Sequence, residues 1–215
     1  PDAGTFHIDP AINVQPLTEE SRKRKKARWP WGSADSPAVE DAQPNAQFAT
    51  RQGDIAINLA ITGAGTPSPQ PLRAVVNVST RQGQITLNVY QIDSGRHLNL
   101  KVESRQGDIH IFLPRSFCGP IHLQNKKGTV TFLPQVKAAA RVLRAAEYDA
   151  MVILGEAALN PNPFGIIGDY MSIVTQTGDI VLGYYDEDVL PEKPTMWQRM
   201  AGWMGGGSAK RIEGA

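Results

Sequence analysis

The sequence predicts an all-β protein built from repeated units of strand, glycine corner and strand. Three observations carry this prediction. A short motif recurs five times along the 215-residue chain, centred on Gly53, Gly83, Gly107, Gly128 and Gly178. Apolar and polar residues alternate on both sides of each glycine, which is the period of a strand with one buried face. A small polar residue precedes each glycine by three positions, and such side chains hydrogen-bond the backbone at turns: Thr50, Thr80, Ser104, Asn125 and Thr175.

Two arrangements of these units fit the pattern. In a β-solenoid, each glycine turns the chain from one face of a coil to the next, and the units stack. Spacings of 30, 24 and 21 residues between the first four glycines suit such a coil. In the alternative, a tight turn at Gln52-Gly53 makes a hairpin of an antiparallel β-sandwich, with Thr50 and Ile55 on one face. The corner RQG occurs three times, and this identity favours the solenoid because like groups in register form ladders.

The stacked arrangement also predicts an interior column and the reason for the glycines. The first apolar residues after the corners should be buried in equivalent positions: Ile55, Ile85, Ile109, Val130 and Ile180. The glycines themselves should have positive φ or leave no space for a Cβ, because other residues disfavour such a backbone.

The amino-terminal part of the chain divides into two segments. Residues 1–14, which include GTFHI at 4–8, are predicted to form a first, partial β rung. Residues 15–46 are basic and proline-rich, so we expect a disordered excursion there. The chain starts at Pro1 without a methionine, which indicates a fragment or a processed form.

Residues 47–188 are predicted to form the repeat domain. A loop, GTPSPQP, interrupts it at 65–71. The long gap between the last two glycines should hold a degenerate rung, with a strand at 151–154. The alanine-rich stretch at 137–148 has the composition of a helix but also fits a distorted strand.

The carboxy-terminal part is predicted to cap the repeats. In residues 189–204 a helical arrangement would place four side chains on one face: Met196, Met200, Trp203 and Met204. Packing over the exposed strands of the last rung is the favoured role, with docking to a partner or a membrane as the alternative. Residues 205–215 should form a flexible tail.

The repeats resemble known sequences in two ways. Their S/T-x-x-G-D-I corners are similar to the adhesin-type β-solenoid repeats of bacteria. The stretch VESRQGDIHIFLPRSFCGPIHLQNKKGTVTFLP, together with GDYMSIVTQTGDIVLGYYDED, resembles an uncharacterised domain family of filamentous, mostly mushroom-forming fungi. This second resemblance covers roughly residues 45–188. It implies a β-solenoid-like fold and carries over no activity, substrate or catalytic residue.

Composition limits the classes of function. Hydrophobic residues make up 41% of the chain and charged residues 20%, as in ordinary globular proteins. The net charge is +1, but six basic residues cluster at 22–28, and the other 16 face 21 acidic ones. This mildly acidic body argues against a nucleic-acid-binding surface over the whole protein. The single cysteine, Cys118, favours a reducing, intracellular compartment. No apolar run is long enough to span a membrane.

A row of basic side chains at the corners is one candidate binding site. In a solenoid, strand spacing of about 4.8 Å would separate successive members of this row, which are Arg51, Arg81, Arg105 and Lys126. Guanidinium groups in a row suit anionic glycans or phosphates. Acidic residues three positions after this or the equivalent position of a repeat could neutralise the row: Asp54, Asp108 and Asp179. Taken in sequence order, no two adjacent rungs both carry an acid in this column, so no catalytic carboxylate pair is predicted.

The remaining candidates favour structural interpretations. By parity, His110 and His122 should point outward, as incidental surface residues rather than metal ligands. Cys118 has no evident histidine partner, which argues against a nucleophile. The acidic run DED at 186–188 is typical of a solvated cap rather than a calcium site. We therefore expect no metal and no cofactor.

The strongest local signal is the basic run SRKRKKARWPW at 21–31. Its charges come from Arg22, Lys23, Arg24, Lys25, Lys26 and Arg28. Such runs serve as nuclear-import signals, nucleic-acid patches or contacts to anionic lipid, and they also occur as plain solvated loops. Neutralising the run should leave stability unchanged and abolish any salt-sensitive binding to anionic vesicles or nucleic acid.

These features predict a non-enzymatic β-solenoid scaffold or binding module for a protein or glycan partner. Two alternatives remain open. One is a carbohydrate-active enzyme on the same fold, which would require a cleft with converging acids. The other is a peripheral membrane or nuclear protein directed by the basic run.

Overall fold

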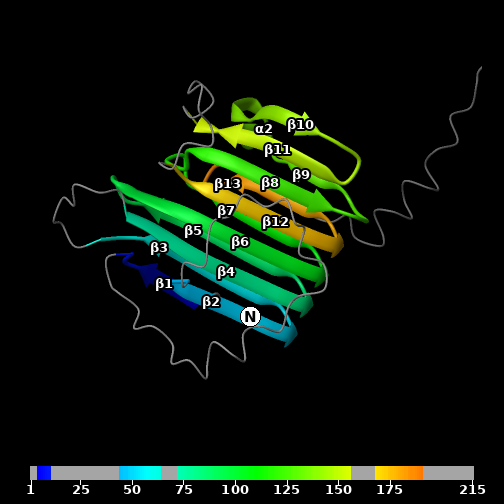
Figure 1. Cartoon of the computed structure of the whole chain (residues 1–215), viewed down its shortest axis with the longest axis horizontal. Helices are drawn as coiled ribbons and strands as arrows, with labels where there is room; N and C mark the ends of the chain where they lie inside the picture. The colour runs from blue at the N-terminus through cyan, green and yellow to red at the C-terminus, as the bar shows by residue number, and fades with distance from the viewer. Residues whose placement is uncertain (1–3, 11–43, 64–71, 156–167, 191–215) are drawn as a thin grey trace, which may run out of the picture.

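The protein folds as two facing β-sheets in the computed structural model. The structure describes residues 4–10, 44–63, 72–155 and 168–190. Figure 1 shows the two layers, with the larger sheet facing the viewer. The basic run at 22–28, the predicted loop at 65–71 and the predicted cap and tail from residue 191 lie outside the described residues.

The smaller sheet has six parallel strands. Their spatial order is β1 (Gly4–Ile8), β3 (Ile55–Ile61), β5 (Ile85–Ile92), β7 (Ile109–Leu113), β13 (Ile180–Tyr184) and β9 (Val130–Phe132). The GTFHI segment is therefore a strand that stacks beside the first full repeat, as its sequence indicated.

The larger sheet has seven strands. Their spatial order is β10 (Arg141–Ala145), β11 (Asp149–Leu154), β8 (Gly119–Asn125), β12 (Tyr170–Thr177), β6 (Arg96–Gln106), β4 (Leu72–Gln82) and β2 (Ala46–Gln52). Pairing is parallel from β8 to β2 and antiparallel from β10 to β8. The alanine-rich stretch at 137–148 contains a helix and a strand, the two forms predicted for it. It starts in the short helix α2 (Pro134–Ala139) and continues into β10.

Each repeat crosses from the larger sheet to the smaller at its glycine. Thr50 lies in β2 and Ile55 in β3, in different sheets, so Gln52-Gly53 is not the turn of a hairpin. The antiparallel alternative is therefore wrong at the corners. The all-β class is confirmed. The described residues form two sheets and no closed solenoid.

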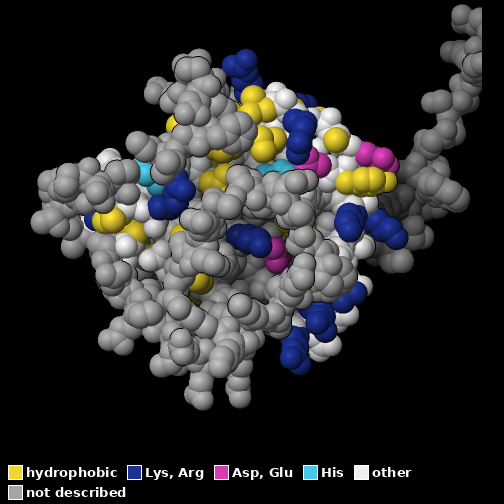
Figure 2. Space-filling view, in the orientation of Figure 1, with side chains coloured by type: hydrophobic (Ala, Val, Ile, Leu, Met, Phe, Trp, Pro, Cys, Tyr) yellow, Lys and Arg dark blue, Asp and Glu magenta, His cyan; other side chains and the backbone are white. Residues whose placement is uncertain are grey.

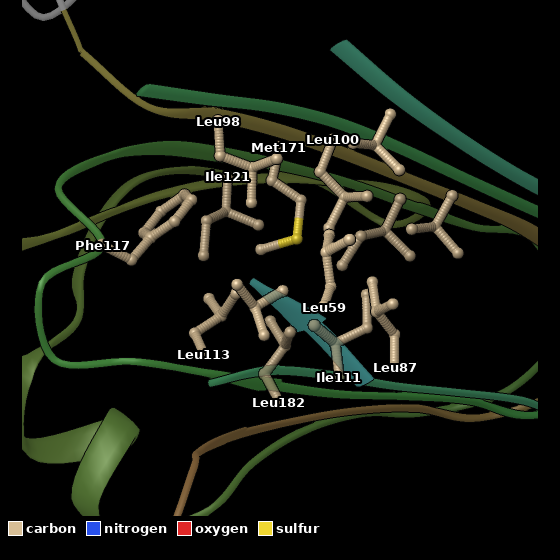
Figure 3. Close-up of a cluster of buried hydrophobic side chains, with 14 of the residues drawn as sticks. Leu59, Leu87, Leu98, Leu100, Ile111, Leu113, Phe117, Ile121, Met171 and Leu182 are labelled. Atoms are coloured by element: carbon tan, nitrogen blue, oxygen red, sulfur yellow. The ribbon is translucent and has the colours of Figure 1, made fainter. Parts of the chain in front are cut away.

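The core fills the space between the sheets. Figure 3 shows side chains of both layers pointing toward one another, with Leu59, Leu87 and Ile111 on one side and Leu98, Leu100 and Met171 on the other. The predicted column after the corners is in register across five strands. Its middle members, Ile85, Ile109 and Ile180, are fully buried, and its end members, Ile55 and Val130, are partly buried.

The repeats do not stack in sequence order. The last repeat, β12–β13, inserts between the third, β6–β7, and the fourth, β8–β9. The sequence prediction assumed that the repeats stack in the order of the chain. The insertion shows that this assumption is wrong. The hairpin β10–β11 then extends the larger sheet beyond the fourth repeat.

Candidate anion-binding edge

The five glycine corners lie side by side along one edge of the molecule. Their spatial order is Gly53, Gly83, Gly107, Gly178 and Gly128, and their φ angles run from +110° to +144°. A Cβ on Gly83 would lie 2.2 Å from the carbonyl oxygen of Gly53, and the next three corners repeat this approach to their neighbours. Glycine therefore recurs both for its positive φ, as expected, and for close backbone stacking.

Aspartate carboxylates continue the stacking after three of the five corners. Asp54 accepts the backbone N–H of Gln84 at 2.7 Å, and Asp108 accepts that of Asp179 at 3.0 Å. Asp179 in turn accepts the backbone N–H and the hydroxyl of Thr129, both at 2.8 Å. Each carboxylate thus holds the next corner in place.

The inserted repeat changes the interpretation of this acidic column. Asp108 and Asp179 are neighbours in the structure, so the prediction that no adjacent corners both carry an acid is wrong. The error follows from assuming sequence order. The carboxylate of each residue accepts a backbone hydrogen bond from the next corner, which is a structural use.

Glutamine side chains form a ladder beside the corners. The Nε2 of Gln52 donates to Oε1 of Gln82 at 3.4 Å, and Nε2 of Gln82 donates to Oε1 of Gln106 at 3.2 Å. Identical amides on adjacent strands make such ladders when they are in register. The RQG identity in the sequence therefore marks three neighbouring strands.

Three arginines accompany this ladder. Arg51, Arg81 and Arg105 precede the ladder glutamines on β2, β4 and β6, and all three are exposed. They occupy adjacent strands, about 4.8 Å apart in a regular sheet. In Figure 2, dark-blue side chains gather along the edge where these strands end in Figure 1. Within the described part of the chain, Arg51 and Arg81 form no ion pair.

Lys126 does not follow Arg105 directly, which corrects the predicted row. Gln176 of the inserted strand β12 lies between them, since Thr175 pairs with both Ser104 and Asn125. The continuous row is therefore the three arginines, and Lys126 and Lys127 form a separate basic group one strand further. With three aspartates beside five basic side chains, the edge keeps a surplus of two positive charges.

A second polar cluster lies at the opposite ends of the same strands. Asp169 is buried just before β12 and accepts the backbone N–H of Leu98 at 2.8 Å and of Cys118 at 2.7 Å. It thereby fastens the inserted strand to β6 on one side and to the start of β8 on the other. His97 Nδ1 lies 3.7 Å from the carboxylate, and Arg73 donates to the carbonyl of Gly168 at 3.1 Å.

Burial raises the pKa of Asp169, although the N–H groups of Cys118 and Leu98 and the charges of His97 and Arg73 act in the opposite direction. Both carboxylate oxygens accept hydrogen bonds from backbone N–H groups, which assigns the residue a structural role. Sequence reasoning missed it. The available signal was the Gly-Asp pair at 168–169, which repeats the dipeptide found at three corners.

The histidine predictions are partly wrong. His110 alternates with the core residues Ile109 and Ile111 and so faces outward, as predicted, but it is buried rather than exposed, with Gln84 Nε2 3.0 Å from its Nδ1. Its strand β7 is central in the smaller sheet, and Thr86 and Val181 flank it on the neighbouring strands. His122 is mostly buried and pairs with Asp149.

Other candidate groups are used in local contacts. Asp149 also pairs with Arg144, which ties β10, β11 and β8 together. Asp188 accepts the N–H of Tyr184 and Gln135, and Glu187 pairs with Arg115. The acidic run at 186–188 thus caps the end of β13 and the start of α2.

Among the described residues, no three His, Cys, Asp or Glu side chains are grouped to hold a metal ion. In the same part of the chain, no helix has the length and apolar character needed to cross a membrane.

These features define a class: an all-β chain of two facing sheets whose glycine corners stack along one polar edge. The chain belongs to the family described as Domain of unknown function (DUF7330), whose profile matches residues 3–187. Comparison with curated proteins and with solved structures gave no match.

Proposed function

We propose that this chain is a non-enzymatic, solenoid-like binding module whose corner edge binds an acidic glycan. The observation that carries the proposal is the row of exposed arginines on three adjacent strands, Arg51, Arg81 and Arg105, beside the ladder of glutamine amides. Guanidinium groups bind carboxylates in a bidentate manner, and amides can hydrogen-bond sugar hydroxyls. A linear acidic glycan lying across the strands would meet these groups at regular intervals.

Two further points support a binding role over catalysis. The aspartates of the edge hold backbone N–H groups, so they act as structural acceptors rather than as a general acid and base. The corners form a regular series in which the same groups recur, which suits an extended partner. We also propose that the chain is related to adhesin-type repeats and to a fungal domain family, as its sequence resemblance suggests. A binding role is compatible with this relationship.

The test measures binding of a polyuronate by calorimetry at low salt. Replacing Arg51, Arg81 and Arg105 with Gln should weaken binding at least about tenfold, the effect of losing roughly 1.4 kcal/mol. A control variant with Gln at Lys101, Lys137 and Arg141 loses the same charge elsewhere and should bind like the parent chain. Equal loss in both variants would show a general charge effect and contradict the proposed edge.

The alternative functions are separate arms of the same test. Glycan length after incubation should stay constant, and shortening would favour a carbohydrate-active enzyme. Vesicles with anionic lipid and a DNA duplex are further probes, together with a variant neutralised at Arg22, Lys23, Arg24, Lys25 and Lys26. If the parent chain binds either probe in a salt-sensitive manner and the neutralised variant does not, the result would favour a membrane or nuclear protein directed by the basic run.

A further inference from the structure

The two sheets have four free edges among the described strands, and they differ in protection. At one end, β9 is only three residues long, and β10 carries Arg141 and Arg144 and a register shift in its pairing with β11. Short strands, charges and bulges are the usual means of preventing edge-to-edge association. At the other end lie β1 and β2.

The edge of β2 lacks these protections. The strand spans seven residues, pairs regularly with β4 and carries a single charged residue, Arg51, near its end. Its Phe48 is partly buried against the core and contacts Phe6 of β1, whose ring lies 4.7 Å away and which is 40% exposed. An unprotected edge with adjacent apolar surface is a site for strand addition.

We propose that the β2 edge pairs with the same edge of a second copy of this chain, in an antiparallel, two-fold-symmetric dimer. The strand is self-complementary about Phe48. With Phe48 opposite Phe48 of the second copy, Gln47 meets Ala49 and Ala46 meets Thr50, so uncharged pairs flank an aromatic pair. Aromatic cross-strand pairs of this kind are favourable.

Charge also fits this symmetric register. Arg51 of one copy meets Asn45 of the other, and no like charges face each other along the strand. An isologous interface requires one patch to complement itself, and β2 satisfies that requirement on both faces. Because the strands run in opposite directions, the two arginine rows would lie on opposite sides of the dimer.

The first test is the oligomeric state of the full chain by sedimentation equilibrium over a hundredfold range of concentration. We expect a monomer–dimer equilibrium. A chain that remains monomeric throughout that range would overturn the proposal.

Paired substitutions then test the edge and its register. The double change Gln47→Lys and Ala49→Lys sets lysines opposite each other twice, and should weaken dimerisation at least about tenfold. Its thermal midpoint should match that of the parent chain at concentrations where both are monomeric. The matched change Gln47→Glu and Ala49→Lys sets opposite charges in register, and should preserve the dimer. Val142→Lys on β10 is the control for the other end and should have no effect. A dimer broken only by Val142→Lys, or equally by both double changes, contradicts the proposed interface.

Discussion

Thr80 and Thr175 occupy equivalent positions three residues before a glycine corner, yet their hydroxyls differ. The Thr80 hydroxyl donates to the carbonyl of Gln82 at 3.3 Å, whereas the buried Thr175 Oγ1 has no hydrogen-bond partner among the described residues. Valine keeps the shape of threonine and removes the hydroxyl. Thr175→Val should therefore leave the free energy of unfolding unchanged or higher, and Thr80→Val should lower it by up to about 1 kcal/mol.

Urea denaturation of both variants checks this expectation. The Oγ atom of Ser104 and the Oδ1 atom of Asn125 lie on the strands beside Thr175, and they too are buried with no hydrogen-bond partner in the part of the chain that the structure describes. A clear loss of stability in Thr175→Val would mean that these three oxygens share an ordered water molecule, since buried water satisfies such groups.

Gly53 and Gly83 separate two reasons for glycine at a corner. Both have positive φ, but a Cβ on Gly53 meets nothing within 4 Å, while one on Gly83 meets the Gly53 carbonyl. Gly53→Ala should cost about 1–2 kcal/mol through backbone strain alone. Gly83→Ala must in addition displace a neighbouring backbone, so we expect a distinctly larger loss or failure to fold.

Thermal and urea unfolding of the two variants measure this difference. Gly53 is the natural control for Gly83, because it lies at the end of the row of corners and shares the motif RQG. Equal losses at the two positions would show that φ alone accounts for the recurrence of glycine.

The strands and their corners could be predicted because they depend on local pattern. Alternation of Ile85, Leu87 and Val89 determines which face of β5 is buried, and the structure buries all three. Parity was misleading for His110, because it tells which face a side chain occupies and not what surrounds it. In the middle of a six-stranded sheet, neighbouring side chains shield an outward-facing residue as well.

The order of the repeats could not be predicted from local pattern. Each corner is chemically similar to the others. In the stack, the corner of Asp179 can therefore lie next to that of Asp108 as readily as the corner of Thr129 could. The residue that fixes the inserted strand, Asp169, acts on Leu98 and Cys118, which lie 71 and 51 positions away in sequence. The same insertion interrupts the basic row before Lys126, so only part of the candidate edge followed from the sequence.

The hairpin β10–β11 is held to β8 by an ion-pair group, which should make its stability depend on pH. Partial burial alone would raise the pKa of Asp149, but the hydrogen bond from His122, with the charges of His122 and Arg144, holds it below its ordinary value of 3.8. A carboxylate with a lowered pKa contributes stability above its unfolded pKa, and this contribution is lost as pH falls through the folded value. Asp149→Asn should therefore destabilise at neutral pH.

The difference between the parent chain and Asp149→Asn should shrink as pH falls below about 4, because the parent carboxylate then also loses its charge. Chemical denaturation at a series of pH values measures it. Glu187→Gln is the control, since its pair with Arg115 is exposed and surface pairs contribute little. A pH-independent difference would assign the Asp149 effect to shape rather than charge.

The insertion of β12–β13 between earlier repeats has a consequence for how the whole chain folds. In a stack built in sequence order, removing the last repeat would expose only the end of the core. Here the last repeat lies inside the stack, and its core side chains Met171, Ile173, Ile180 and Leu182 are fully buried between the third and fourth repeats. A fragment ending at residue 155 should therefore lose cooperative unfolding altogether.

Deletion of residues 1–43 provides the matched control, because it removes only the edge strand β1 from the described fold. This variant should still unfold in one cooperative transition, with a lower midpoint from the exposure of β3. Near-UV circular dichroism and urea titration of both fragments distinguish the cases. Cooperative unfolding of the fragment ending at residue 155 would mean that β6 and β8 can pair without the inserted strand. Loss of cooperativity in that fragment would instead show that the order of strands in space, rather than in sequence, decides when this fold is complete.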